Sequence, residues 1–356
     1  MASGVRLKVL YVGLRFDYGE PRRGKSFEFE NLYGSLKTMD YLEISFFPFD
    51  QVLRERGREQ MNRLLLEEVR RVQPQLVFFV LFTDEIERST IEQISKQTIT
   101  VNWFADDHWR FESFSRHWAP LFHWVTTTYS GAIEKYHALG FQNVIKTQWA
   151  CNTHVYYPRD VPRDLDVTFV GRKHSNRAQV LRLLRRKGLS VRAWGRGWPG
   201  GRLSQEEMIR TFCRSSINLN FTESSVSFGL KRYAKLFLTR RADGTLRLNT
   251  LKEFEGMASV LFQPPPPQIK ARNFEIPGCG GFLLTSDADD LSSYYKPGQE
   301  IVVFENAADL IEKVQYYLAH DEEREAIRQG GYERTIRDHS YEKRFLDIFR
   351  TMGFQL

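Results

Sequence analysis

The side chains best suited to chemistry lie in the stretch Gln268–Thr285, which reads QIKARNFEIPGCGGFLLT. Two cations, Lys270 and Arg272, precede the acid Glu275, and a glycine turn containing Gly280 leads into an apolar strand. A carboxylate can accept hydrogen bonds from two sugar hydroxyls, cations can bind phosphates, and glycines let a backbone approach a ligand closely. The combination suits a nucleotide diphosphate and its ribose, although a surface cluster of ion pairs would use the same residue types.

A second candidate anion site lies upstream, between an expected strand and an expected helix. The stretch Gly171–Arg177 reads GRKHSNR. Helix-start amides together with Arg172 and Arg177 can bind a phosphate, and the alternative is a solvated basic loop. Gly195 follows the next strand in the sequence WGRGWP. It would allow a donor to approach the backbone, or it would belong to a tight turn with aromatic packing.

Asp106, Asp107 and His108 are the candidates for acid–base catalysis. They follow directly on the apolar strand expected at 98–104. One carboxylate could take the proton of an acceptor hydroxyl, and the histidine could face a sugar or a phosphate. Because adjacent side chains point in different directions, we expect only one aspartate to have this role. The alternative is an aspartate that caps a helix beside a structural histidine.

The sequence FEIPGCGGFLL around Glu275 resembles the C-terminal signature of the CgeB-like (spore maturation protein type) glycosyltransferases, which are similar to the retaining glycosyltransferases of the GT-B fold. The resemblance runs from about Val167 to the C-terminus, and it includes Gly298 and His339-Ser340-Tyr341. It implies that a sugar moves from a nucleotide-diphosphate sugar to a hydroxyl acceptor, with retention at the anomeric carbon.

The same resemblance implies roles for individual residues. Glu275 would hold the donor ribose, the loop from Gly171 would bind the donor diphosphate, and Gly195 would belong to the donor site. One position departs from the wider group, which has a second Glu eight positions before the ribose-binding one; that position is Pro267 here. The stereochemical outcome is therefore left open.

Two other patterns resemble reactive sites but have simpler interpretations. Asp287-Ala288-Asp289 has the Asp-x-Asp spacing of metal-dependent sugar transferases, yet it lies in an acidic turn, and we expect no tightly bound metal. Cys279 has no base near it in the sequence, so we interpret it as a packing residue. The three cysteines are odd in number and form no CxxC pair, which argues against a disulfide framework and a zinc site.

Strands alternate with helices along most of the chain, which predicts parallel sheets with right-handed crossovers. In the first half we expect strands at 7–13, 41–47, 76–82, 98–104, 124–128 and 143–146, and helices at 27–38, 51–72, 89–97 and 130–139. After the linker Pro158–Arg163 we expect strands at 166–171, 190–194 and 217–221, and helices at 176–187, 204–215, 307–318, 321–336 and 341–352.

The alternation and the linker predict an α/β fold with two doubly wound Rossmann-like domains and an active site in the cleft between them, and the family resemblance implies that this fold is of the GT-B type. Residues 1–158 would form the acceptor-side domain and residues 159–340 the nucleotide-sugar donor domain. Residues about 222–267 are too long for a connection and contain the hairpin signal ADGT, so we expect an insertion of unassigned function. Residues 341–356 would form a helix that packs back toward the N-terminal domain.

Composition limits the partners. The 356 residues carry a net charge of +7, from 51 bases against 44 acids, and this mild excess gives no reason to expect nucleic acid. It is compatible with a diphosphate donor, an anionic acceptor or loose contact with an anionic membrane. The start MASGVRLKVLYVG leads straight into a strand, and no apolar run approaches about 18 residues. We expect a cytoplasmic protein with at most peripheral contact at the inner face of the membrane, and we leave its oligomeric state open.

Three other functions would use the same features. A nucleotide-sugar epimerase or hydrolase could share the fold. A non-catalytic sugar-nucleotide-binding protein would suit the missing upstream Glu. A nucleic-acid-binding protein has only the basic charge in its favour.

Overall fold

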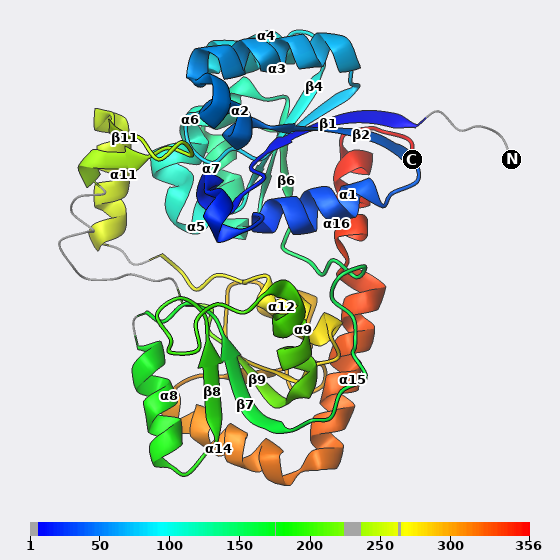
Figure 1. Cartoon of the computed structure of the whole chain (residues 1–356), viewed down its shortest axis with the longest axis vertical. Helices are drawn as coiled ribbons and strands as arrows, with labels where there is room; N and C mark the ends of the chain where they lie inside the picture. The colour runs from blue at the N-terminus through cyan, green and yellow to red at the C-terminus, as the bar shows by residue number, and fades with distance from the viewer. Residues whose placement is uncertain (1–5, 175, 224–235, 263–264) are drawn as a thin grey trace, which may run out of the picture. The chain divides into compact units, whose positions relative to one another are not determined.

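The computed structural model describes residues 6–174, 176–223, 236–262 and 265–356. The chain divides into two compact units. Unit 1 contains Met1–Gln148, Gly229–Pro265 and Arg344–Leu356, and unit 2 contains Trp149–Phe228 and Pro266–Lys343 (Figure 1). The domain limits predicted from the sequence stay predictions.

Unit 1 is built on a parallel sheet in the order β2-β1-β3-β4-β5-β6. Its strands are β1 (Leu7–Gly13), β2 (Leu42–Pro48), β3 (Leu76–Phe79), β4 (Ile99–Phe104), β5 (Trp124–Thr127) and β6 (Val144–Lys146). All four residues of β3 are buried, as its continuous run LVFF predicts for a central parallel strand. Every strand expected in the first half is therefore confirmed, with small differences in the bounds.

Helices cover both faces of this sheet (Figure 1). They include α1 (Gly34–Lys37), α2 (Phe49–Arg56), α3 (Arg58–Val72), α4 (Arg88–Ser95), α5 (Asp107–Arg110), α6 (Arg116–Trp118), α7 (Ile133–Ala138) and α16 (Tyr341–Thr351), together with the π-helices η3 (Phe29–Tyr33) and η4 (Phe111–Ser115). The single helix predicted at 51–72 is wrong, because Gly57 breaks it. Its φ of +78° ends α2, and α3 begins at the next residue.

Alternate residues of β3 build the two cores of unit 1. Val77 and Phe79 point to one face, where they join the apolar side of α3 and α4. Phe78 points to the other face, where its ring lies 5.7 Å from Phe345 of α16, and the ring of Trp103 lies 6.2 Å from Phe345. This segment of α16 therefore belongs to the core of unit 1.

The described part of the predicted insertion belongs to unit 1. It forms an antiparallel hairpin of β10 (Leu238–Arg240) and β11 (Leu246–Leu248), followed by α11 (Leu251–Phe262). The hairpin predicted at ADGT is thus confirmed. Gly256 of α11 lies so close to η4 that an added Cβ would be 2.7 Å from the backbone of Glu112. Residues 224–235 and 263–264 of the predicted insertion lie outside the described residues.

Unit 2 contains a second parallel sheet, in the order β13-β12-β9-β7-β8. Its strands are β7 (Leu165–Val170), β8 (Val191–Trp194), β9 (Ser215–Asn220), β12 (Leu283–Ser286) and β13 (Val302–Phe304). Its helices are α8 (Arg177–Arg186), α9 (Gln205–Arg214), α12 (Arg272–Gly278), α13 (Leu291–Tyr294), α14 (Ala307–Ala319) and α15 (Asp321–Asp338). The sequence analysis did not predict two short elements of this unit, the strand β13 and the helix α13.

Both sheets reverse their strand order at one place, between β1 and β3 in unit 1 and between β7 and β9 in unit 2. The prediction of two doubly wound α/β units is confirmed. Ligands of such sheets bind beyond the carboxyl ends of the strands at this switch point. Within the described ranges, no helix is both long and apolar enough to cross a membrane.

Candidate functional site

The glycines that end β7 and β8 are in direct backbone contact in unit 2. Gly195 has a φ of +124°, and a Cβ added there would lie 2.2 Å from the carbonyl oxygen of Gly171. The same carbonyl accepts a hydrogen bond from Nε1 of Trp198 at 2.9 Å, and Trp198 is buried in the core of the unit. The stretch WGRGWP therefore forms a tight turn with aromatic packing, and a contact of Gly195 with a donor stays a prediction.

Arg177 joins the carboxyl ends of the two strands at the switch point. Its side chain is buried, and its Nη2 and Nη1 atoms donate to the carbonyl oxygens of Phe221 at 2.9 Å and Arg172 at 3.2 Å. Burial lowers the pKa of Arg177 to about 10. Arg172 itself is exposed. Arg177 thus braces the loop, while the side chain of Arg172 is available to a ligand.

Three cations from two segments act on His174, in the loop after β7. Burial, together with the positive charges of Arg177, Arg172 and Lys270, lowers the pKa of His174 to about 4. The imidazole is therefore neutral at neutral pH, inside a region of positive potential. Three of the predicted anion ligands thus come together here. We did not single out His174 from the sequence, because a histidine in a basic loop has no periodic signal.

A buried amide network fixes the start of α12. The backbone N–H of Lys270 donates to Oδ1 of Asn273 at 2.9 Å, and Asn220 donates to the same oxygen at 3.0 Å. Thr285 of β12 accepts from Asn220 at 3.1 Å and from Asn273 at 3.3 Å. The Nζ of Lys270 donates to Gln268 at 2.8 Å. This network was not predicted, although polar residues inside the apolar strand INLNF were its sequence signal.

Arg272 and Glu275 form an ion pair along one turn of α12. The side chain of Glu275 is fully buried, whereas that of Arg272 is 26% exposed and lies over the ring of Phe212. Burial lowers the pKa of Arg272. Oε2 of Glu275 makes this pair. The other carboxylate oxygen, Oε1, has no hydrogen-bond partner among the residues that the structure describes.

Gly280 lies in the turn between α12 and β12. It has a φ of +67°, and its carbonyl oxygen accepts from Nη1 of Arg328 at 3.1 Å. Its neighbour Cys279 is buried, and burial raises the pKa of that thiol well above its ordinary value. These contacts support packing roles for the turn, and a contact of Gly280 with a donor stays a prediction.

The acidic turn after β12 is held by local hydrogen bonds. Oδ1 of Asp287 accepts from the N–H of Ala288 at 2.8 Å, and its carbonyl oxygen accepts from Thr222. Within the described ranges, no group of three or more His, Cys, Asp or Glu residues is placed to hold a metal ion.

In unit 1, the three candidates for acid–base catalysis have different environments. Asp107 is buried, and its Oδ2 accepts from the hydroxyl of Tyr136 at 2.9 Å. Burial raises its pKa to about 6. His108 is also buried, and its ring stacks on Tyr129 with 4.3 Å between centroids. Asp106 precedes α5 and is only half-buried, so it is the candidate that a ligand could reach.

A further acid, Glu28, lies close enough to Asp106 to be affected by its charge. Glu28 is half-buried and follows the loop after β1. Burial raises the pKa of Glu28 to about 7, and the charges of Asp106 and Asp17 contribute to the rise. Two neighbouring carboxyl groups at the carboxyl ends of β1 and β4 could share acid–base work. The sequence did not suggest Glu28, because an acid near a helix start is common.

Comparison by sequence gives one family match. A family described as glycosyl transferase-like matches residues 172–350. This match includes the loop after β7, α12 and α15. No curated protein matches the chain significantly.

Several solved structures resemble the whole chain. Sucrose-phosphate synthase from Thermosynechococcus elongatus has a TM-score of 0.56 and 11% identity, with 98% of each chain covered. HepE from Anabaena, solved in complex with UDP, has a TM-score of 0.57 and 8% identity, with 98% of this chain and 100% of HepE covered. The lipopolysaccharide outer core galactosyltransferase WaaB has a TM-score of 0.53 and 13% identity, with 97% and 100% covered. At these identities the likeness shows the fold, and it confirms the predicted GT-B fold class.

Proposed function

Because this chain belongs to the glycosyl transferase-like family and is a glycosyltransferase, we propose that it moves a sugar from a nucleotide-diphosphate sugar to a hydroxyl acceptor. We further propose that it is of the CgeB-like subtype and that it works with retention and without a tightly bound metal. The acceptor would be a glycan, a lipid or a protein. The UDP complex of HepE supports a nucleotide donor for a chain of the same fold.

The observation that carries this proposal is the group of cations at the switch point of unit 2. Arg172, Arg177 and Lys270 all act on His174, and the charged groups that shift its pKa are all positive. A departing nucleoside diphosphate develops negative charge, which preorganised cations stabilise. Arg172 and Lys270 would contact the diphosphate directly. Arg177 would hold the loop, because its guanidinium is already bound to two carbonyl oxygens.

Glu275 and Arg272 would complete the donor site. The partly exposed guanidinium of Arg272 is oriented by its ion pair with Glu275 and would meet the second phosphate. Oε1 of Glu275 is the acceptor left for a ribose hydroxyl, since its other oxygen is bound to Arg272. Because Glu275 is fully buried, this contact requires its neighbours to move when the donor binds.

On the acceptor side, we assign the proton transfer to Asp106 together with Glu28. The charge of Asp106 contributes to the pKa of about 7 at Glu28, which suits a general base at neutral pH. Asp107 would support the site by fixing α5, because Tyr136 already binds its carboxylate.

The test is a thermal-shift screen with UDP, GDP, TDP, ADP and CDP. A ligand at 100 to 1,000 times its Kd should stabilise the protein by about 3 to 4 kcal/mol. We expect one nucleotide to raise the Tm, and we expect Lys270→Ala and Arg172→Ala to remove most of the shift. Lys187→Ala, which removes an exposed cation after α8, should keep it. No shift with any nucleotide would contradict the proposed donor class.

Turnover then separates the remaining functions. With the matching nucleotide sugar, a transferase releases the nucleotide faster when an acceptor is added. Release of free sugar or an epimer without acceptor would favour the hydrolase or epimerase. Binding without any turnover would favour a sugar-nucleotide-binding protein.

A further inference from the structure

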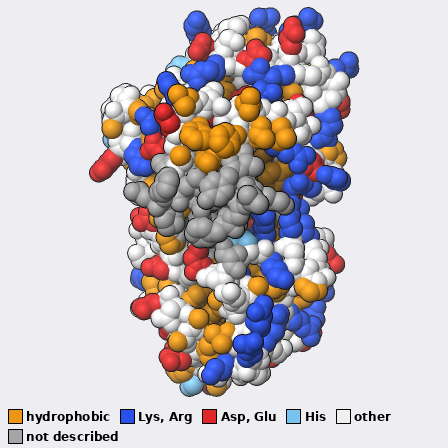
Figure 2. Space-filling model, turned by 90° about the vertical axis from the view of Figure 1, so that its left-hand side faces the viewer, with side chains coloured by type: hydrophobic (Ala, Val, Ile, Leu, Met, Phe, Trp, Pro, Cys, Tyr) orange, Lys and Arg blue, Asp and Glu red, His pale blue; other side chains and the backbone are white. Residues whose placement is uncertain are grey.

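The hairpin β10–β11 turns its leucines toward solvent. Leu246, Leu248 and Leu251 are 63%, 76% and 73% exposed, and they are the most exposed large apolar side chains in the described ranges. Leu238 pairs with Leu248 across the hairpin, so both lie on one face. Figure 2 looks onto the side of Figure 1 on which the hairpin lies, and hydrophobic side chains gather on unit 1 there. We call Leu238, Leu246, Leu248 and Leu251 the leucine face.

The opposite face of the hairpin carries charges that point into unit 1. Arg247 lies between two exposed leucines in the chain, and its guanidinium contacts Asp84 at 3.1 Å and Glu253 at 2.6 Å. The N–H of Ala242 donates to the buried Glu85 at 3.1 Å. A hairpin in water normally turns polar residues outward and apolar residues inward. In this hairpin the leucines face outward beside the half-exposed Arg240, and the ion pairs of Arg247 on the other face hold them there.

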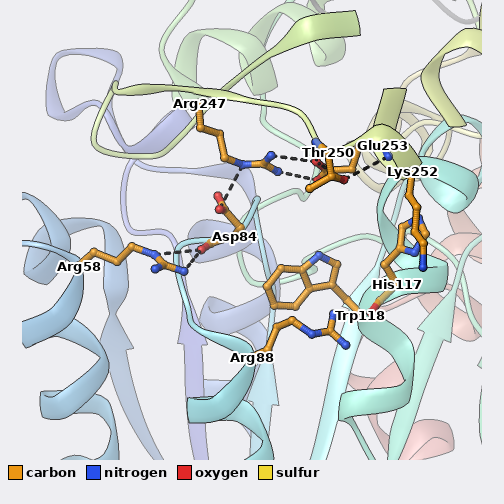
Figure 3. Close-up of a pocket in the computed structure, with 9 residues that line it drawn as sticks. All are labelled: Arg58, Asp84, Arg88, His117, Trp118, Arg247, Thr250, Lys252 and Glu253. Carbon is orange, nitrogen blue, oxygen red and sulfur yellow. Dashed lines mark hydrogen bonds and ion pairs between the residues drawn. The ribbon is translucent and has the colours of Figure 1, made fainter. Parts of the chain in front are cut away.

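A cationic pocket of about 460 Å³ lies beside the hairpin (Figure 3). It is lined by residues of the hairpin segment and by residues that follow strands of the first sheet. Its cations outnumber its acids: Arg58, Arg88, Arg247 and Lys252 against Asp84 and Glu253. Both acids are already in ion pairs with Arg247. Arg58 is also paired, with Glu87 at 2.9 Å. The positive charge left in the pocket is therefore that of Arg88 and Lys252, and Lys252 adjoins Leu251 of the leucine face.

We propose that the leucine face and this pocket dock the protein on an anionic lipid surface. The leucines would enter the boundary between headgroups and acyl chains, and the cations of the pocket would bind lipid phosphates. Lipid is the occupant that has both chemistries. A free phosphate would leave the leucines in water, and a second copy would bring an equal net charge of +7 against the same cationic pocket. The docking needs no sugar donor, so it stands apart from the proposed function.

The test is co-sedimentation of the full chain with vesicles. We expect binding to phosphatidylcholine vesicles that contain phosphatidylglycerol, and little binding to phosphatidylcholine alone. The triple variant Leu246→Ser, Leu248→Ser, Leu251→Ser should lower the partition coefficient at least about tenfold, because three exposed leucines no longer enter the lipid. Lys252→Glu should weaken binding to the anionic vesicles specifically. Leu139→Ser removes a leucine that is 41% exposed at the end of α7 and is the matched control.

Each contrary result would overturn the proposal. The proposal is wrong if the wild-type protein binds neither kind of vesicle, or if the triple variant binds as well as the wild type. Self-association of the wild type without vesicle binding, removed in the triple variant, would assign the face to a second copy. A thermal shift with inorganic phosphate, lost in Lys252→Glu and without vesicle binding, would assign the pocket to a soluble anion. An unchanged Tm in the variants shows that they fold.

Discussion

Arg241 and Asp84 are 157 residues apart in the chain and form a two-contact ion pair within unit 1. Nε of Arg241 lies 3.1 Å from Oδ1 of Asp84, and Nη2 lies 2.9 Å from Oδ2. Arg247 contacts the same carboxylate at 3.1 Å. Asp84 follows β3 and Arg241 precedes the hairpin turn, so this one acid ties the insertion to the first sheet.

Replacing Asp84 by Asn should loosen the hairpin. Two arginines would lose their counter-charge, and we expect a loss of about 1 to 3 kcal/mol in the free energy of unfolding. Hydrogen exchange should speed up in β10 and β11 and stay unchanged in β4. The control is Glu43→Gln, which removes an exposed ion pair with Lys8 at 3.9 Å and should have little effect. Equal exchange in both variants would contradict the anchoring role of Asp84.

Gly195 should not tolerate a side chain. Its φ of +124° disfavours other residues, and an added Cβ would lie 2.2 Å from the backbone of Gly171. We expect Gly195→Ala to cost roughly 3 kcal/mol or more in urea denaturation, since both backbone strain and a clash must be relieved. Gly201→Ala is the control, because Gly201 also has a positive φ but has open space around it. Its cost should be about 1 kcal/mol.

Replacing Arg177 should lower the stability of the protein, whereas replacing Arg172 should weaken nucleotide binding. Arg177→Ala leaves the carbonyl oxygens of Phe221 and Arg172 without their donor, so it should lower the free energy of unfolding by about 2 to 4 kcal/mol. Arg172→Ala should leave stability within about 0.5 kcal/mol, because that side chain is exposed. It should still weaken nucleotide binding, measured by calorimetry. The opposite pattern would mean that Arg177 is the phosphate ligand.

Asp107 should make the protein less stable as pH rises through the weakly acidic range. Burial raises its folded pKa from 3.8 to about 6, so the folded state takes up a proton that the unfolded state has already lost. The cost appears between about pH 4 and 6 and reaches up to about 3 kcal/mol. Asp107→Asn should flatten the dependence of Tm on pH across this window. The exposed Asp40→Asn is the control and should leave the slope unchanged.

Glu28 should set the pH dependence of turnover. Its pKa is raised to about 7 by burial and by the charges of Asp106 and Asp17. As a general base it must be deprotonated, so kcat/KM should rise with pH through about 7. Glu28→Gln should remove this rise and lower kcat by about a hundredfold. The exposed Glu59→Gln should keep the wild-type profile. A profile that Glu28→Gln leaves unchanged would assign the base to Asp106 alone.

Local patterns in the sequence determined the two parallel sheets, the hairpin at Asp243-Gly244 and the helix that carries Glu275. These features depend on neighbours in the chain: apolar runs, glycine turns and helix periodicity. The same patterns indicated Arg172 and Arg177 at one candidate anion site and Lys270 at another, and in the structure all three act on His174.

Only the tertiary structure decided that the insertion belongs to unit 1, that Asp107 is the buried aspartate, and that Arg177 binds backbone carbonyl oxygens. Asp106 and Asp107 are adjacent, yet only Asp107 meets the hydroxyl of Tyr136, 29 residues away. Arg177 is bound by Phe221, 44 residues away, and Asp84 by Arg241. Burial and ion pairing depend on groups that folding brings together from distant parts of the chain. The residue type shows what a side chain can do, and its distant partners decide what it does.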